Sequence, residues 1–112
     1  MIHWHTLGNE DQLAAIIRQS GLRPQVIFKH STRCSISSVI KSRLERAAAP
    51  EGVDFYYLDL IAHRSLSSKI AEDLQVYHES PQVLLVKNGA CVYDESHYGI
   101  TMDDIITAAS AA

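Results

Sequence analysis

Residues 26–37 read VIFKHSTRCSIS, and this stretch decides the expected fold. Its first three residues, Val26-Ile27-Phe28, form a short apolar run typical of a buried strand. Cys34 follows a few residues past the end of that strand, and Ser35 begins a stretch with helical periodicity. Ligands of open α/β sheets bind at the carboxyl ends of the strands. The pattern therefore places a cysteine at the first turn of a helix, on the edge of a sheet where chemistry is expected.

The rest of the chain divides into strands and helices around this stretch. The predicted strands are residues 2–6, 25–30, 53–60, 82–87 and 91–94, and the predicted helices run from Asn9 to Gly21, Ser35 to Ala49, Leu66 to Val76 and onward from Thr101. Asn88-Gly89, between the last two strands, is a strong hairpin signal. The order predicts an α/β fold with a mixed central sheet of about five strands, the last two an antiparallel hairpin, flanked by about four helices.

Composition narrows the class of protein. The 112 residues are 46% hydrophobic and 21% charged, which is typical of one globular domain spanning residues 1–112 and fits disorder, collagen-like repeats or coiled coil poorly. No apolar run approaches the roughly 18 residues of a membrane span, and no secretory signal is visible. A net charge of −3 argues against nucleic-acid binding. We therefore expect a cytoplasmic monomer with two reduced cysteines, Cys34 and Cys91.

The surroundings of Cys34 predict a reactive thiol. The unpaired amides and positive dipole end at a helix N-terminus favour thiolate over thiol. Arg33 is adjacent, and Lys29 and His30 lie just upstream. Such surroundings lower the pKa of a cysteine below its ordinary value of about 8.5. Ser37 follows on the same helix face, where its hydroxyl is expected to donate to the sulfur. The alternative is an inert buried cysteine.

Arranged in this way, the chain resembles the thioredoxin-like superfamily over nearly its whole length. Cys34-Ser35-Ile36-Ser37 stands where that superfamily has C-x-x-C, with serine replacing the second cysteine. Ser80-Pro81 matches its cis-proline, Asn88-Gly89 its hairpin turn, and Gly99 the glycine that precedes its last helix. More narrowly, residues 28–37 (FKHSTRCSIS) resemble the monothiol bacilliredoxins, which are redox-active proteins of the bacillithiol system.

Three positions depart from these patterns. Phe28 replaces the buried acid of thioredoxins, and Arg33 replaces the aromatic residue before their active cysteine. Both changes argue against dithiol reduction of the thioredoxin type. Ser35 stands where bacilliredoxins often have proline, which leaves the redox potential open.

The resemblance implies a thiol–disulfide oxidoreductase that removes bacillithiol from mixed disulfides on client proteins, with bacillithiol as co-substrate. Cys34 is the implied nucleophile, and Ser37, the last residue of the C-x-x-S motif, is the other implied catalytic residue. Cys91 is not expected to resolve the mixed disulfide, because the strand 82–87 runs away from Cys34. At about 3.3 Å per residue it places Cys91 roughly 20 Å away, beyond the ~7 Å limit between bridged Cα atoms.

The resemblance also implies a substrate-binding surface, formed by Lys29, His30, Arg33, Ser80, Pro81, Gly99 and Thr101. Lys29 and Arg33 are expected to hold the two carboxylates of bacillithiol, although both are equally typical of ordinary surface charge. The backbone of Ser80 is expected to pair with an extended client segment. His30 either orients the thiolate or caps the strand. The amides that open the last helix are expected to hold a carboxylate.

Neither a metal nor a tightly bound cofactor is expected. His3 and His5 share one strand face, but two ligands make no site. One alternative function is iron–sulfur cluster or small-thiol binding, as in monothiol glutaredoxins, although those have Gly-Phe where this chain has Ser35-Ile36. Another is a non-catalytic adaptor with an unreactive Cys34. Arsenate reductases share C-x-x-S, but their nucleophile usually follows the first strand.

Overall fold

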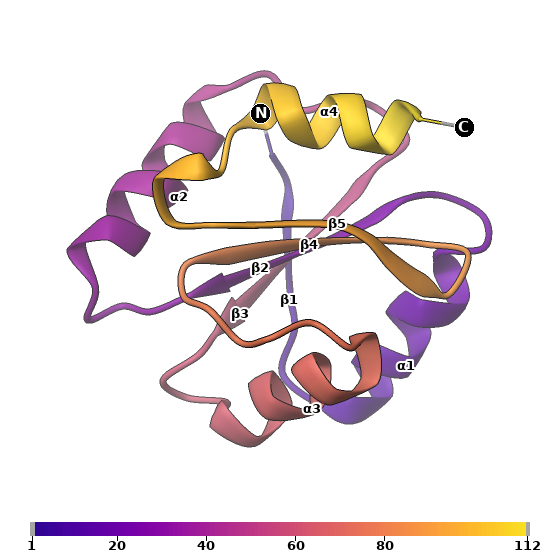
Figure 1. Ribbon diagram of the computed structural model, residues 1–112, viewed down its shortest axis with the longest axis horizontal. Helices are drawn as coiled ribbons and strands as arrows, with labels where there is room; N and C mark the ends of the chain where they lie inside the picture. The colour runs from indigo at the N-terminus through magenta and orange to yellow at the C-terminus, as the bar shows by residue number, and fades with distance from the viewer. Residues whose placement is uncertain (1, 112) are drawn as a thin grey trace.

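The computed structural model describes residues 2–111 as a five-stranded mixed sheet with helices on both faces (Figure 1). The strands are β1 (Trp4–Thr6), β2 (Gln25–His30), β3 (Asp54–Asp59), β4 (Gln82–Lys87) and β5 (Ala90–Ser96). The helices are α1 (Glu10–Gln19), α2 (Ser35–Arg46), α3 (Arg64–Leu74), the short 3₁₀ helix η1 (His97–Gly99) and α4 (Met102–Ser110). The predicted fold class is confirmed. None of the helices in the described part of the chain combines the length and apolar character needed to cross a membrane.

The sheet has the strand order β1-β3-β2-β4-β5. β1, β3 and β2 run parallel, whereas β4 is antiparallel to both β2 and β5. Parallel strands need helical crossovers, and α1 and α2 supply them around β2. Figure 1 shows α2 and α4 on one side of the sheet and α1 and α3 on the other.

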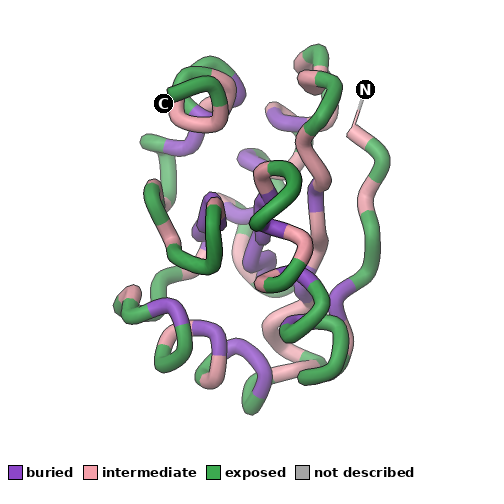
Figure 2. Tube along the Cα trace, turned by 90° about the vertical axis from the view of Figure 1, so that its right-hand side faces the viewer, coloured by how far each residue is buried: buried purple, intermediate pink, exposed green. Residues whose placement is uncertain are grey.

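Side chains alternate across the central strands, so the sheet buries two separate apolar clusters. On β2, Val26 and Phe28 belong to the cluster beneath α2 and α4, whereas Ile27 belongs to the cluster beneath α1 and α3. On β4, Val83 and Leu84 divide between the same two clusters. Figure 2 shows the buried segments gathered towards the middle of the molecule. This alternation decides which side chains of β2 face the helix that carries Cys34.

Local signals set most element ends. Asn9 caps α1 through its side chain, which accepts from the Gln12 amide at 2.9 Å. The predicted box is complete, because the Gln12 side chain also accepts from the Asn9 amide. The hairpin turns at Asn88 (φ 52°) and Gly89 (φ 81°), both in the left-handed region that a two-residue turn requires.

Several boundaries differ from the prediction, and α3, for example, spans Arg64–Leu74 instead of residues 66–76. β1 begins at Trp4 rather than Ile2, and β5 runs on to Ser96. α2 ends at Arg46, three residues before the predicted end at Ala49. Ala47 is already extended, with φ −84° and ψ 153°, and both Ala47 and Ala49 pack against the cluster beneath α2. Packing of these partly buried side chains therefore favours an extended backbone from Ala47 onwards, and the helix ends before Pro50.

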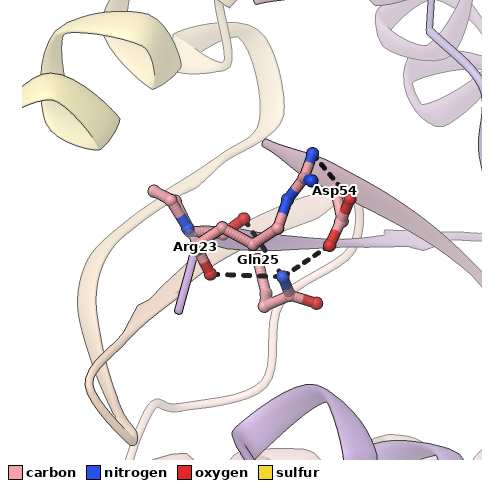
Figure 3. Close-up of polar contacts among 4 residues, drawn as sticks. Arg23, Gln25 and Asp54 are labelled. Atoms are coloured by element: carbon pink, nitrogen blue, oxygen red, sulfur yellow. Dashed lines mark hydrogen bonds and ion pairs between the residues drawn. The ribbon is translucent and has the colours of Figure 1, made fainter. Parts of the chain in front are cut away.

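A polar cluster joins the amino ends of β2 and β3, at the opposite end of the sheet from Cys34 (Figure 3). Arg23 pairs with Asp54 at 3.1 Å, and the buried Gln25 donates to the same carboxylate at 2.7 Å. Gln25 also donates to the carbonyls of Arg23 and Pro24. These contacts hold the starts of β2 and β3 together, whereas the buried Oε1 atom of Gln25 has no hydrogen-bond partner among the described residues.

Candidate functional site

Cys34 lies where β2 passes into α2, and it is the N-cap residue of that helix. Its backbone is extended (φ −110°, ψ 119°), and its amide donates to the Ser31 carbonyl at 3.2 Å. Its own carbonyl accepts from Ser38 at 3.2 Å, which begins the helix. The side chain makes no capping hydrogen bond and is half-buried. The thiol is thus held by a fixed backbone at a helix N-terminus, with part of its surface accessible.

Ser37 is buried beneath this turn and connects α2 to the end of β2. Its hydroxyl oxygen lies 2.6 Å from Nδ1 of His30 and accepts from the Ser31 amide at 3.1 Å. Among the described residues, no hydrogen bond joins Ser37 to Cys34. The structure therefore directs the hydroxyl to the strand end instead of to the sulfur, and Ser37 supports the backbone that carries Cys34.

His30 is surrounded by aromatic rings and by charged side chains. Its ring stacks on Phe28 at 5.8 Å and lies 5.5 Å from the Tyr57 ring. Burial and the nearby Lys41 ammonium lower the pKa of His30 below its usual value, opposed by the carboxylates of Asp59 and Glu45. The lowered pKa favours the neutral form of the ring, whose Nδ1 atom contacts the Ser37 hydroxyl.

The expectation for Lys29 is corrected by the structure. Lys29 has the same strand parity as Ile27, so it points to the side of the sheet covered by α1 and α3, away from α2. Its side chain is fully buried, and its ammonium donates to the Ser67 carbonyl beside His78. A buried group of this kind is not in position to bind the carboxylate of a ligand at the surface.

Arg33 and Thr101 are the two remaining positions at which a carboxylate was expected to bind, and their surroundings differ. Arg33 is exposed next to Cys34, and no ion pair involves it among the described residues. Thr101, in contrast, caps α4 by accepting from the Asp104 amide at 3.2 Å. Asp103 also lies in that first turn, so two acids oppose a bound carboxylate there. The cation beside Cys34 is thus better placed for an anion than the N-terminus of α4.

Ser80 and Pro81 lie alongside the end of β2. Lys29 pairs with Gln82 across the antiparallel β2–β4 ladder, so the two residues before Gln82 continue along His30 and the loop that leads to Cys34. The Ser80–Pro81 peptide bond is cis. The Pro81 carbonyl accepts from the His97 amide at 3.0 Å, which connects this turn to η1.

The loop that contains Gly99 packs against α2 further along the helix. Arg43 donates to the carbonyls of Tyr98 and Ile100, each at 3.4 Å. At Gly99 itself, a Cβ atom would lie 2.7 Å from Cδ of Glu95, so the absence of a side chain leaves room for this carboxylate. Gly99 thus lies between the two residues whose carbonyls accept from Arg43, and next to the Glu95 side chain.

Comparison with known families agrees with this geometry. The profile of the family described as monothiol bacilliredoxin BrxC matches residues 5–105, which include the cysteine turn, Ser80-Pro81 and the hairpin. The chain belongs to the monothiol bacilliredoxin family. Membership in this family makes the protein a redox-active thiol protein.

Solved structures place this bacilliredoxin in the thioredoxin fold. A proposed oxidoreductase with a thioredoxin fold is 30% identical, with a TM-score of 0.82 over 94% of this chain and 92% of that chain. Thioredoxin from Malassezia sympodialis is 17% identical, with a TM-score of 0.75 over 98% and 90% of the two chains. Spinach chloroplast thioredoxin f, short form, is 14% identical, with a TM-score of 0.69 over 94% and 88%. The last two show the fold alone.

The second cysteine of this bacilliredoxin lies at the far end of the sheet. Cys91 pairs with Val86, near the hairpin, whereas Cys34 lies beyond the other end of β4. Burial raises the pKa of the Cys91 thiol, and its sulfur donates to the Tyr93 carbonyl at 3.3 Å. Within residues 2–111 no three histidine, cysteine or acidic side chains gather in a way that could hold a metal ion.

Sequence reasoning missed the partners of the buried polar residues. Ser67 and His78, which contact Lys29, belong to α3 and to the segment before Ser80. Strand parity was the available signal for Lys29, because it separates this residue from Phe28 and His30. No signal in the sequence indicates which residues receive its ammonium.

Proposed function

We propose that this protein removes bacillithiol from mixed disulfides on client proteins through Cys34. The Cys34 thiolate attacks the bacillithiol sulfur, the bond between that sulfur and the client cysteine breaks, and the client leaves as a thiolate. Cys34 is then joined to bacillithiol in a disulfide. A second bacillithiol thiolate attacks this bacillithiol sulfur, which releases bacillithiol disulfide and restores the Cys34 thiolate.

The placement of Cys34 carries the proposal. It is a half-buried, unpaired thiol at the N-terminus of α2, in a chain of the bacilliredoxin family. Ser37 stands where a resolving cysteine would be needed, and it is engaged with His30. Cys91 lies at the opposite end of β4. With no second thiol at hand, the mixed disulfide on Cys34 waits for an external small thiol.

Arg33 supports the choice of an anionic small thiol. It is exposed beside Cys34, where its guanidinium can form two parallel hydrogen bonds with one carboxylate. Lys29 does not take part, because it is buried on the other side of the sheet. The proposed site therefore combines the Cys34 thiolate, Arg33 and the backbone of Ser80.

Intact-mass measurement tests the proposal. The reduced protein is incubated with bacillithiol disulfide or with glutathione disulfide, and adducts are followed over time. We expect one adduct on Cys34, formed faster from bacillithiol disulfide. Cys34→Ala abolishes transfer from an S-bacillithiolated client, whereas Cys91→Ala and Ser37→Ala retain much of it. Full activity of Cys34→Ala contradicts the mechanism, and no adduct from either disulfide favours a non-catalytic adaptor.

A further inference from the structure

Lys29 is an ionisable residue in the apolar core that the exchange chemistry leaves unexplained. Its side chain is 0% exposed. Its ammonium donates to the Ser67 carbonyl at 3.2 Å and lies 3.3 Å from Nδ1 of His78. The Ser67 hydroxyl is also 3.3 Å from this nitrogen. One buried cation thus connects β2, α3 and the segment that joins α3 to β4.

Gln82 makes a parallel contact from the neighbouring strand. It pairs with Lys29 in the β2–β4 ladder, and its side chain is 1% exposed. Its amide nitrogen donates to the carbonyl of Tyr77 at 3.0 Å. The Lys29–Gln82 pair therefore holds two consecutive residues, Tyr77 and His78, from inside the core. Tyr77 itself is 95% exposed, so these contacts come from the core side of the segment.

This arrangement is costly for the fold. Burial lowers the pKa of Lys29 to about 8, and no carboxylate pairs with it among the described residues. His78 faces Lys29, Ser67 and the carboxylate of Glu79, and its pKa is lowered mainly by burial and then by the Lys29 charge. An unbranched apolar residue at position 29 would fill the same space without desolvating a charge. Stability alone therefore does not account for Lys29.

The segment that this pair holds leads directly to Ser80. The ladder register continues Ser80 and Pro81 along the end of β2, towards Cys34. Among the described residues, no backbone hydrogen bond involves the amide or carbonyl of Ser80, although the flanking Pro81 carbonyl is bound to His97. The Ser80 backbone groups are thus unpaired at the entrance of β4, next to the end of β2 that leads to Cys34, and their position depends on the residues before them.

We propose that Lys29, together with Gln82, is a positioning residue that fixes residues 77–80 so that the backbone of Ser80 pairs with the extended client segment of the mixed disulfide. This inference rests on the proposed function and adds the buried residues that hold the Ser80 backbone in place. A small symmetric disulfide has no polypeptide backbone to pair with Ser80. Loss of the Lys29 contacts therefore weakens reaction with a peptide substrate and leaves reaction with a small disulfide intact.

Paired substrates test this selectivity. Rates of adduct formation on Cys34 are measured with an S-bacillithiolated peptide and with bacillithiol disulfide. In Lys29→Met we expect the rate with the peptide to fall about tenfold, the effect of losing one charge-assisted hydrogen bond, and the rate with the small disulfide to stay within about twofold. Lys87→Met is the matched control, because Lys87 also donates to backbone carbonyls, those of Ala109 and Ala111, but at the other end of β4. It leaves both rates within about twofold.

A second pair of variants keeps the test decisive if Lys29→Met fails to fold. His78→Leu removes the acceptor that faces Lys29, whereas His78→Asn keeps an acceptor oxygen near the position of Nδ1. We expect His78→Leu to slow adduct formation with the peptide but not with bacillithiol disulfide, and we expect His78→Asn to restore the rate with the peptide. Equal losses with both substrates, or no loss with either, overturn the positioning role. Failure of the wild-type protein to form an adduct from either substrate contradicts the proposed function instead.

Discussion

Removal of the Ser37 hydroxyl tests how the cysteine turn is held. In Ser37→Ala, the buried Ser31 amide and the Nδ1 atom of His30 both lose the partner that they contact at 3.1 Å and 2.6 Å. A buried polar group without a partner costs about 1–3 kcal/mol, and alanine returns roughly 0.5 kcal/mol of helix propensity. We expect the free energy of unfolding to fall by about 2–3 kcal/mol, with a Tm lower by about 10 °C.

Urea unfolding at pH 7 measures this change. The chain has one tryptophan, Trp4, whose ring stacks on Phe28 at 5.7 Å, so its fluorescence reports on the cluster beneath α2. Ser38→Ala is the matched control, because Ser38 is the next residue of the same helix and is exposed. It should unfold within about 0.5 kcal/mol of the wild type. A Ser37→Ala protein as stable as Ser38→Ala would refute the assignment of Ser37 as the support of the turn.

Three further outcomes are expected. Burial lowers the pKa of Lys29 from 10.5 to about 8, so between these pH values the folded state binds fewer protons than the unfolded state. The free energy of unfolding of the wild type, relative to that of Lys29→Met, therefore rises by about 3 kcal/mol as the pH increases from 8 to 10.5. Urea unfolding at these two pH values measures the change. Asn9→Ala removes the cap that accepts from Gln12 and lowers the Tm, at a cost of about 1 kcal/mol. Trp4→Phe loses the 2.9 Å hydrogen bond to Glu45 and lowers the free energy of unfolding by about 1 kcal/mol, measured by thermal unfolding. An unchanged Tm in Asn9→Ala or in Trp4→Phe contradicts the contact assigned to that residue.

Much of the fold was predictable because its signals are local. The Val26-Ile27-Phe28 run, the Asn9 cap and the Asn88-Gly89 turn each act over a few residues, and the structure confirms β2, the cap of α1 and the hairpin. The end of α2 was not predictable in this way. It depends on Ala47 and Ala49 packing against a cluster whose members come from distant parts of the chain.

In the functional site too, some features follow from local sequence signals and others from packing between distant segments. The sequence by itself determined that Cys34 begins a helix after a buried strand, because apolar periodicity and chain order are properties of neighbouring residues. Only the tertiary structure decided that Lys29 is buried against Ser67 and that the Ser37 hydroxyl engages His30. The partner of a polar side chain depends on strand parity, register and the helix that covers that face. These are set when segments far apart in the chain pack together, so no local pattern contains them.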